Sequence, residues 1–112
     1  MSYLPEIYKG FRQRFGGIAD TYDKLALECH QWGPLDAKTR RLVKLGVSIG
    51  LASEGGVRSH ARRALEEGIT ADEILHTVLL SFTTTGFPTM SAALKWVEEV
   101  IEKHGVPTRS KK

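Results

Sequence analysis

The chain has 112 residues, of which 41% are hydrophobic and 26% charged, and its formal net charge is +3. This length suits one domain with a single core, and this composition excludes a wholly disordered chain. The N-terminus lacks the basic start and apolar run of a secretory signal, and no apolar stretch approaches the roughly 20 residues that span a bilayer. We therefore expect a cytoplasmic protein without a membrane partner.

The positive charge is concentrated at the C-terminus. Three of the 16 basic residues lie in residues 108–112, which contain no acid, and the other 13 equal the acidic residues in number. A nucleic-acid binder usually carries its positive charge on a folded face. The sequence thus predicts a single domain over residues 1–107, a disordered basic tail over residues 108–112 and no nucleic-acid partner.

Cys29 is the one cysteine of the chain, so an intrachain disulfide is impossible and a reducing compartment is expected. It continues an apolar stripe of Ile18, Tyr22 and Leu25 at helical spacing, which predicts a buried and inert thiol. No His, Cys, Asp and Glu residues have the spacing of metal ligands, and no phosphate loop or dinucleotide fingerprint occurs. We expect neither a metal nor a cofactor.

Glycine and proline divide the chain into segments of helical periodicity, and no segment alternates as a strand does. Asp36 is a predicted N-cap, and Thr70 with Glu73 has the form of a capping box. Gly68 is suited to follow a helix end, and Gly86 is expected to close the next helix. The prediction is an all-α bundle of five to six helices, similar to other small helical bundles.

The segment from Leu42 to Ala52 is apolar almost all round, which predicts a helix buried on most of its sides. Gly46 and Gly50 lie on one face of this helix, where we expect close approach of a neighbouring backbone. A chain this short has little core in which to bury such a helix. The sequence therefore favours a homo-oligomer.

Residues 53–60 form the segment in which chemistry is expected. Two glycines precede a helix whose first turns hold Arg58 and His60, and Glu54 lies just before them. A helix N-terminus offers unpaired N–H groups and partial positive charge, so this point suits a carboxylate or phosphate ligand. His60 is able to exchange protons near neutral pH. The alternative is a structural histidine that binds a backbone carbonyl.

Three stretches carry a resemblance to a known family. Residues 35–43 (LDAKTRRLV), residues 58–74 (RSHARRALEEGITADEI) and Gly86-Phe87-Pro88 followed by Ala92-Ala93 resemble, in this order and spacing, the carboxymuconolactone decarboxylase family, which includes the alkylhydroperoxidase D-like proteins. The resemblance covers about residues 20–103. It implies an all-α alkylhydroperoxidase D-like fold and assembly into homotrimers or homohexamers.

The peroxidase branch of that family has a Cys-x-x-Cys pair before its histidine and an upstream glutamate. Here Ser53 and Gly56 occupy the two cysteine positions, and Arg41 occupies the glutamate position. Dithiol chemistry needs one thiolate to attack and a second thiol to resolve. Alkylhydroperoxidase or peroxiredoxin-type activity is therefore disfavoured, including a peroxidase that would use Cys29 with an external thiol.

The decarboxylase branch resembles the chain better, through Arg-Ser-His at residues 58–60 and through Arg40. This resemblance implies a lyase that acts on a small carboxylated, lactone-type substrate without redox thiols. By the same resemblance His60 is the catalytic residue that gives or takes a proton, and Arg58 and Arg40 bind carboxylates, for which guanidinium groups are suited.

Two positions depart from the decarboxylase pattern, which often has glutamate where this chain has Gly56 and tyrosine where it has Thr84. Thr84 reads first as part of a helix end and second as a hydroxyl facing a cavity. We nevertheless include Thr84 and Glu54 among the predicted substrate-binding residues. The alternative function is a non-enzymatic module on the same fold that binds a small ligand or a partner.

Overall fold

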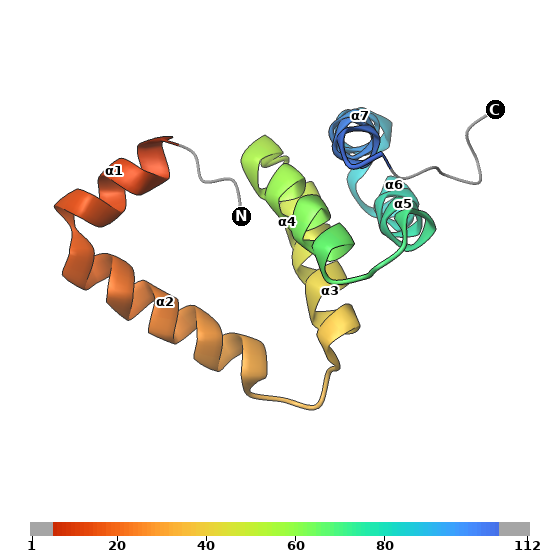
Figure 1. The fold of residues 1–112 in the computed structure, drawn as a ribbon. Coiled ribbons are helices and arrows are strands. Elements are labelled where there is room, and N and C mark those ends of the chain that lie inside the picture. The colour runs from red at the N-terminus through yellow and green to blue at the C-terminus, as the bar shows by residue number, and fades with distance from the viewer. Residues whose placement is uncertain (1–5, 106–112) are drawn as a thin grey trace. The chain divides into compact units, whose positions relative to one another are not determined.

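The computed structural model describes residues 6–105, so the predicted basic tail lies outside the described residues. These residues form helical segments and contain no strand, which confirms the all-α class (Figure 1). The α6 segment is a single turn of four residues, and the other six are longer helices. The segments are α1 (Glu6–Arg14), α2 (Gly16–Gln31), α3 (Ala37–Gly50), α4 (Glu54–Glu66), α5 (Ala71–Leu80), α6 (Phe82–Thr85) and α7 (Phe87–Lys103).

The chain divides into two compact units, one ending at Pro34 and one beginning at Leu35. The single domain expected over residues 1–107 stays a prediction. The first unit contains α1 and α2, which Arg12 joins through ion pairs to Asp20 (2.9 Å) and Asp23 (2.7 Å). Charged side chains therefore contribute directly to the contact between these two helices.

Cys29 is exposed on α2, so the prediction of a buried thiol is wrong. The other members of its stripe are exposed as well: Ile18 by 63%, Tyr22 by 64% and Leu25 by 60%. Ala19 is the buried residue that the described part of this unit contains. Helical spacing identified the stripe correctly, but no helix of the same unit packs on it within the described residues.

Several helix boundaries of the second unit lie where the sequence predicts, and two do not: α4 already begins at Glu54, so the two glycines lie inside it, and α5 ends at Leu80, so that Gly86 closes α6. Asp36 caps α3 by accepting a hydrogen bond from the Thr39 amide at 2.8 Å. Thr70 forms the capping box of α5 with Glu73. Gly68 and Gly86 have φ of +89° and +95°, a region that glycine enters without steric cost. Local sequence therefore determines these boundaries.

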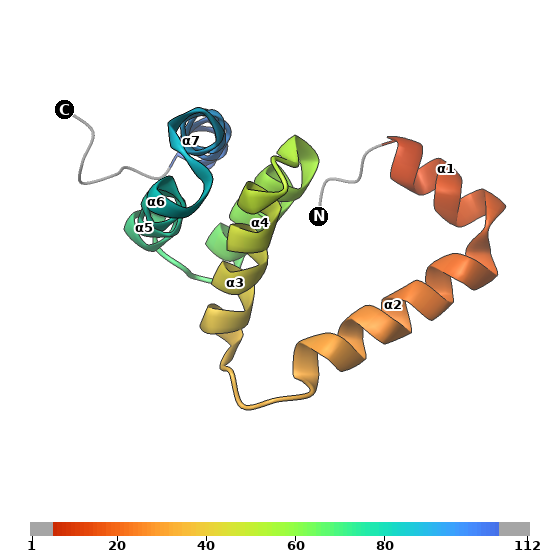
Figure 2. The ribbon, with the colours of Figure 1, turned by 180° about the vertical axis from the view of Figure 1, so that it is seen from behind.

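The core of the second unit lies where α4 packs between α3 and α7, with α5 against α3 and α7. Figures 1 and 2 show α3 and α4 alongside one another and α5 and α7 beside them, seen nearly end-on. The fully buried side chains come from all four helices, so each of these helices contributes to one shared core. The largest are Leu45, Ile49, Ile74, Val57, Val78 and Val97.

The α3 helix buries one face and exposes the opposite one. Leu45 and Ile49 are completely buried, whereas Val43 is 50% exposed, Val47 58% and Leu51 73%. The prediction of a helix buried on most sides is wrong for a single chain, because α4, α5 and α7 all pack on the same side. We call Val43, Val47 and Leu51 the outer face of α3.

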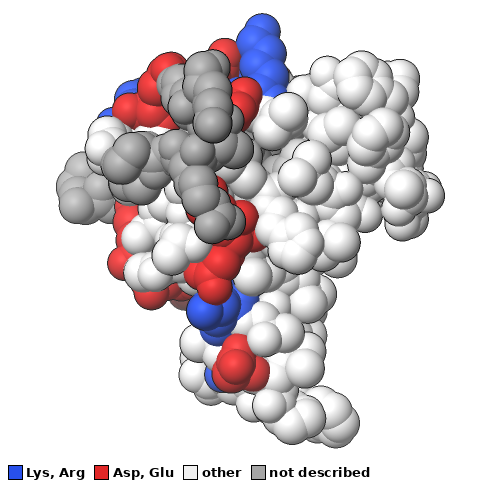
Figure 3. Space-filling view, turned by 90° about the vertical axis from the view of Figure 1, so that its right-hand side faces the viewer, with Lys and Arg blue, Asp and Glu red and all other residues white. Residues whose placement is uncertain are grey.

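The side of the molecule that carries α5 to α7 shows a broad uncharged area next to a group of carboxylates (Figure 3). Apolar side chains of these helices are exposed, among them Leu79, Leu80, Phe82 and Phe87. Such residues add to the apolar surface that the outer face of α3 exposes. Across residues 6–105, none of the helices combines the length and the apolarity needed to cross a bilayer.

Candidate functional site

His60 lies in the middle of α4 and is hydrogen-bonded to Arg41 of α3. Nη1 of Arg41 lies 2.8 Å from Nδ1 of His60. The other side of the same guanidinium donates to both carboxylate oxygens of Glu67, from Nε to Oε1 at 3.0 Å and from Nη2 to Oε2 at 2.8 Å. One guanidinium thus joins an imidazole to a carboxylate, and we call Arg41, His60 and Glu67 the Arg41 cluster.

Helix periodicity explains this geometry. His60 and Glu67 are seven residues apart, which is about two turns, so both lie on the same side of α4 and its C-cap. Arg41 lies one turn before the fully buried Leu45 and is itself 8% exposed. A buried arginine requires charged or polar partners, and the packing of α3 on α4 supplies them.

The surroundings of His60 lower its pKa to about 4 from the usual 6.5. Burial contributes most, because it penalises the charged imidazolium, and the positive charges of Arg41, Arg63 and Lys44 add to the shift. The negative charge of Glu67 opposes it. His60 is therefore a neutral imidazole at pH 7, in surroundings that contain more positive than negative charge.

Arg58, which was predicted to bind a substrate carboxylate, is paired with two carboxylates of the chain. Its Nε donates to Glu54 at 3.0 Å and its Nη2 donates to Glu99 of α7 at 2.6 Å. These contacts raise the pKa of Arg58, first through Glu99 and then through Glu54. The structure brings the predicted residues Arg58 and Glu54 together as an ion pair that also links α4 to α7.

The remaining predicted residues lie on other elements. Arg40 of α3 donates from Nε to the carbonyl oxygen of Leu35 at 2.8 Å. Thr84 is exposed in α6, which packs against α5 and α7. His60 is instead hydrogen-bonded to Arg41, the residue at the position that corresponds to the glutamate of the peroxidase branch.

Sequence reasoning missed Arg41 and Glu67 as companions of His60. A signal for Arg41 exists, because it is four residues from Leu45 and so lies on the buried side of a very apolar helix. The spacing of seven between His60 and Glu67 is a second signal. Neither identifies the pairing alone, since the contact depends on how α3 and α4 are aligned.

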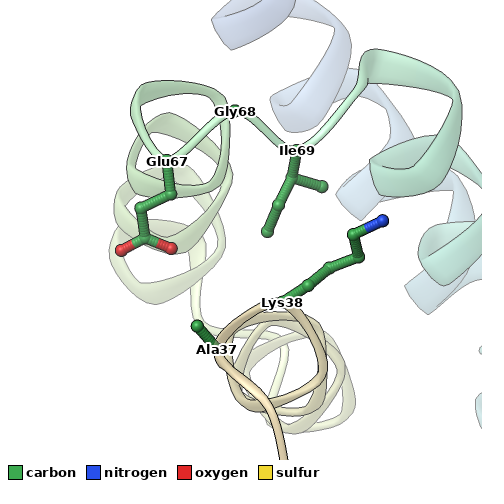
Figure 4. Close-up of a pocket in the computed structure, with 5 residues that line it drawn as sticks. All are labelled: Ala37, Lys38, Glu67, Gly68 and Ile69. Atoms are coloured by element: carbon green, nitrogen blue, oxygen red, sulfur yellow. The ribbon is translucent and has the colours of Figure 1, made fainter.

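A pocket of about 120 Å³ adjoins the Arg41 cluster at Glu67. It lies between the start of α3 and the turn from α4 to α5, and Figure 4 shows the Ile69 side chain pointing toward α3 between Glu67 and Lys38. Small-molecule sites commonly occupy 300 to 1,000 Å³, so this pocket is smaller than a typical one. Its lining residues are Ala37, Lys38, Glu67, Gly68 and Ile69.

Fold and site together define a class: a small all-helical protein whose candidate site is built on an arginine-bound neutral histidine, with Gly56 one turn and Ser53 two turns before it in place of thiols. The model of the carboxymuconolactone decarboxylase family matches residues 17–99. The chain belongs to this family, as its resemblance predicted.

Two curated relatives are similar to the chain. A 4-carboxymuconolactone decarboxylase of Acinetobacter baylyi is 33% identical over 72 residues, which cover 64% of this chain and 54% of that protein. An uncharacterised protein of Methanocaldococcus jannaschii is 25% identical over 99 residues, which cover 88% of this chain and 95% of that protein. The aligned part thus spans about half the length of the decarboxylase.

Proposed function

We propose that the protein is a lyase of the decarboxylase type that acts on a small carboxylated, lactone-type substrate at His60 without redox thiols. The observation that carries this proposal is the charge around His60. Arg41, Lys44 and Arg63 place positive charge near the imidazole, and the carboxylate of Glu67 opposes it. An anionic substrate is favoured in such surroundings, and the similarity to a 4-carboxymuconolactone decarboxylase supports the same substrate class.

The proposed reaction breaks the bond between a carboxylate and a carbon conjugated to the lactone. Carbon dioxide leaves, the electron pair of that bond passes into the conjugated carbonyl, and the carbon skeleton then takes up one proton. Negative charge develops on the lactone oxygen during the first step. A hydrogen-bond donor or a nearby cation lowers the free energy of that charge, and His60 with its cationic neighbours supplies both.

Arg58 and Arg40 remain proposed carboxylate-binding residues, and Glu54 and Thr84 remain proposed contacts. For Arg58 this role requires that a substrate carboxylate exchange with Glu54 or Glu99, since both bind it in the described chain.

We also propose a cytoplasmic homo-oligomer, a trimer or hexamer, in which second copies cover the outer face of α3. Val43, Val47 and Leu51 are at least half exposed there. An added Cβ at Gly46 or Gly50 would meet nothing within 4 Å, so the space beside these two glycines is open to another chain. Burial of this apolar area supports association.

Release of carbon dioxide from 4-carboxymuconolactone tests the function. We expect turnover by the wild type and a fall in kcat on the order of 10²-fold in His60→Ala, the size seen when one donor to a developing oxyanion is removed. His76→Ala is the matched control, because His76 is an exposed histidine of α5. Equal rates for wild type and His60→Ala would reject the role of His60.

The same assay separates the alternative functions. A binding module without activity would gain thermal stability from the lactone, by an amount set by its concentration over Kd, and yet release no carbon dioxide. Peroxide consumption that depends on Cys29 would instead support a peroxidase. Cys29 is exposed and thus open to peroxide, but the chain has no second cysteine to resolve its oxidised form, which disfavours that outcome.

A further inference from the structure

The contact between Arg41 and His60 determines where the imidazole proton lies. Arginine has five N–H donors, no acceptor, and stays protonated in proteins. The atom of His60 that lies 2.8 Å from Nη1 of Arg41 must therefore accept a hydrogen bond, and that atom is Nδ1. A neutral imidazole that accepts at Nδ1 carries its proton on Nε2.

Glu67 determines which nitrogen of the Arg41 guanidinium faces His60. Its two oxygens bind Nε and Nη2 of Arg41 in the paired geometry that fixes the plane of a guanidinium. Nη1 is the remaining nitrogen, and it is the one that faces His60. The side chain of Arg41 is 10% exposed, so little water competes for these bonds. Arg41 is held in place on one side and bonded to the imidazole on the other.

The opposite ring nitrogen, Nε2, takes no part in the contact with Arg41, and His60 is partly exposed. In the part of the chain that the structure describes, Nε of Arg62 is the buried side-chain polar atom that has no hydrogen-bond partner. Nε2 of His60 is therefore not among the buried polar atoms that lack a hydrogen-bond partner. Since Arg41 occupies Nδ1, Nε2 is the ring nitrogen left for a contact with an incoming molecule.

We propose that Arg41 is a positioning residue that confines the imidazole proton to Nε2, so that His60 meets its ligand as a hydrogen-bond donor to an anionic oxygen and not as a base. The ligand class is a carboxylate or an enolate oxygen, which the positive surroundings also favour. The proton stays on Nε2 throughout, and the proton that the product carbon takes up comes from solvent. The identity of the ligand rests on the proposed function, whereas the position of the proton does not.

The position of the proton is tested without any substrate. We would record long-range ¹H–¹⁵N correlations of the histidine rings in the full-length, ¹⁵N-labelled protein at pH 7, with His60→Gln to assign the signals. The wild type should show His60 with a protonated Nε2 and an unprotonated Nδ1. His76, which is exposed on α5, provides the internal reference.

Arg41→Met removes every donor to Nδ1 and is the decisive variant. We expect the two ring-nitrogen shifts of His60 to approach those of His76 and its titration midpoint to rise toward the ordinary histidine value. Glu67→Gln keeps the Arg41 donor and should keep the proton on Nε2. Should Arg41→Met fail to fold, Arg41→Lys and the wild-type spectrum still decide the matter.

Two results would overturn the proposal: a proton on Nδ1 of His60 in the wild type, or a folded Arg41→Met protein with an unchanged tautomer and titration. Turnover distinguishes this failure from failure of the proposed function. A correct tautomer in a protein that releases no carbon dioxide rejects the function alone. Turnover together with a proton on Nδ1 rejects the positioning role alone.

Discussion

Gly56 lies where α4 approaches α3 near the candidate site, and there is little room for a side chain at this position. A Cβ added to Gly56 would lie 2.9 Å from Oγ of Ser48, 3.0 Å from Oγ of Ser53 and 3.2 Å from Cβ of Ser48. Ser53 is the N-cap of α4, and Ser48 is buried in α3. Glycine at this position lets the start of α4 approach α3, one helical turn before His60.

Gly56→Ala should therefore destabilise the protein by about 1 to 3 kcal/mol, the usual cost of forcing an extra carbon into packed surroundings. Gly55→Ala is the matched control, since a Cβ there meets nothing within 4 Å. It should stabilise the helix by about 0.5 to 1 kcal/mol. Urea unfolding of both variants measures the difference, and equal midpoints would contradict the steric account.

The lowered pKa of His60 makes stability depend on pH with a defined sign. The folded protein protonates His60 at a pKa of about 4 and the unfolded chain at 6.5. Between these values the unfolded chain binds more protons, so the free energy of unfolding falls as the pH falls from 6.5 to 4. The loss is on the order of 2 kcal/mol once partial exposure is taken into account.

His60→Gln should lack this part of the pH dependence. Carboxylates titrate in both proteins, so the difference between the unfolding free energies of wild type and variant isolates His60. We expect that difference to change between pH 6.5 and 4 and to stay constant above pH 7. A difference that is constant over the whole range would show that His60 titrates normally in the folded protein.

For single residues, the sequence identifies His60 as a candidate site residue but does not identify the residues that contact it. The position of His60 on α4 follows from helical spacing, which is a local property. Its contact with Arg41 depends on how α3 and α4 are aligned, and the two residues are 19 positions apart in the chain. The pairing of Arg58 with Glu99 spans 41 residues and is equally non-local. Periodicity within one helix does not contain that information.

At the scale of whole elements, capping residues explain the helix boundaries. Thr70 accepts a hydrogen bond from the Glu73 amide at 3.1 Å, and the Glu73 carboxylate accepts one from the Thr70 amide at 3.0 Å. Thr70→Ala should cost about 1 kcal/mol. Thr70→Ser keeps the accepting oxygen and should cost much less. Thermal unfolding of the two variants checks this, and equal losses would show that the cap contributes little.

Helix starts and ends were predictable because caps and glycines act within a few residues. Burial was less predictable. The stripe that ends at Cys29 is exposed throughout, and the apolar segment of α3 exposes Val43, Val47 and Leu51, although both segments have the apolar residues of buried helices. Hydrophobicity indicates that a surface tends to be covered, but it does not say by which chain.

At the scale of the whole molecule, the outer face of α3 is where self-association is expected. Val47→Glu places a charge at the centre of that face and should reduce the mass in solution to that of one chain, because a buried unpaired charge is costly. Gln31→Glu adds the same charge at an exposed position of α2 and serves as the control. Sedimentation would show the change, and an unaltered mass for Val47→Glu would exclude this face as the interface.

We expect His60 to work as a neutral donor oriented by Arg41, within a site for a carboxylated substrate. The most direct measurement is the pH dependence of kcat/KM for carbon dioxide release from 4-carboxymuconolactone. We expect no change attributable to His60 between about pH 5.5 and 8, because its pKa of about 4 lies below this range. A limb near pH 6.5 that disappears in His60→Gln would contradict the claim.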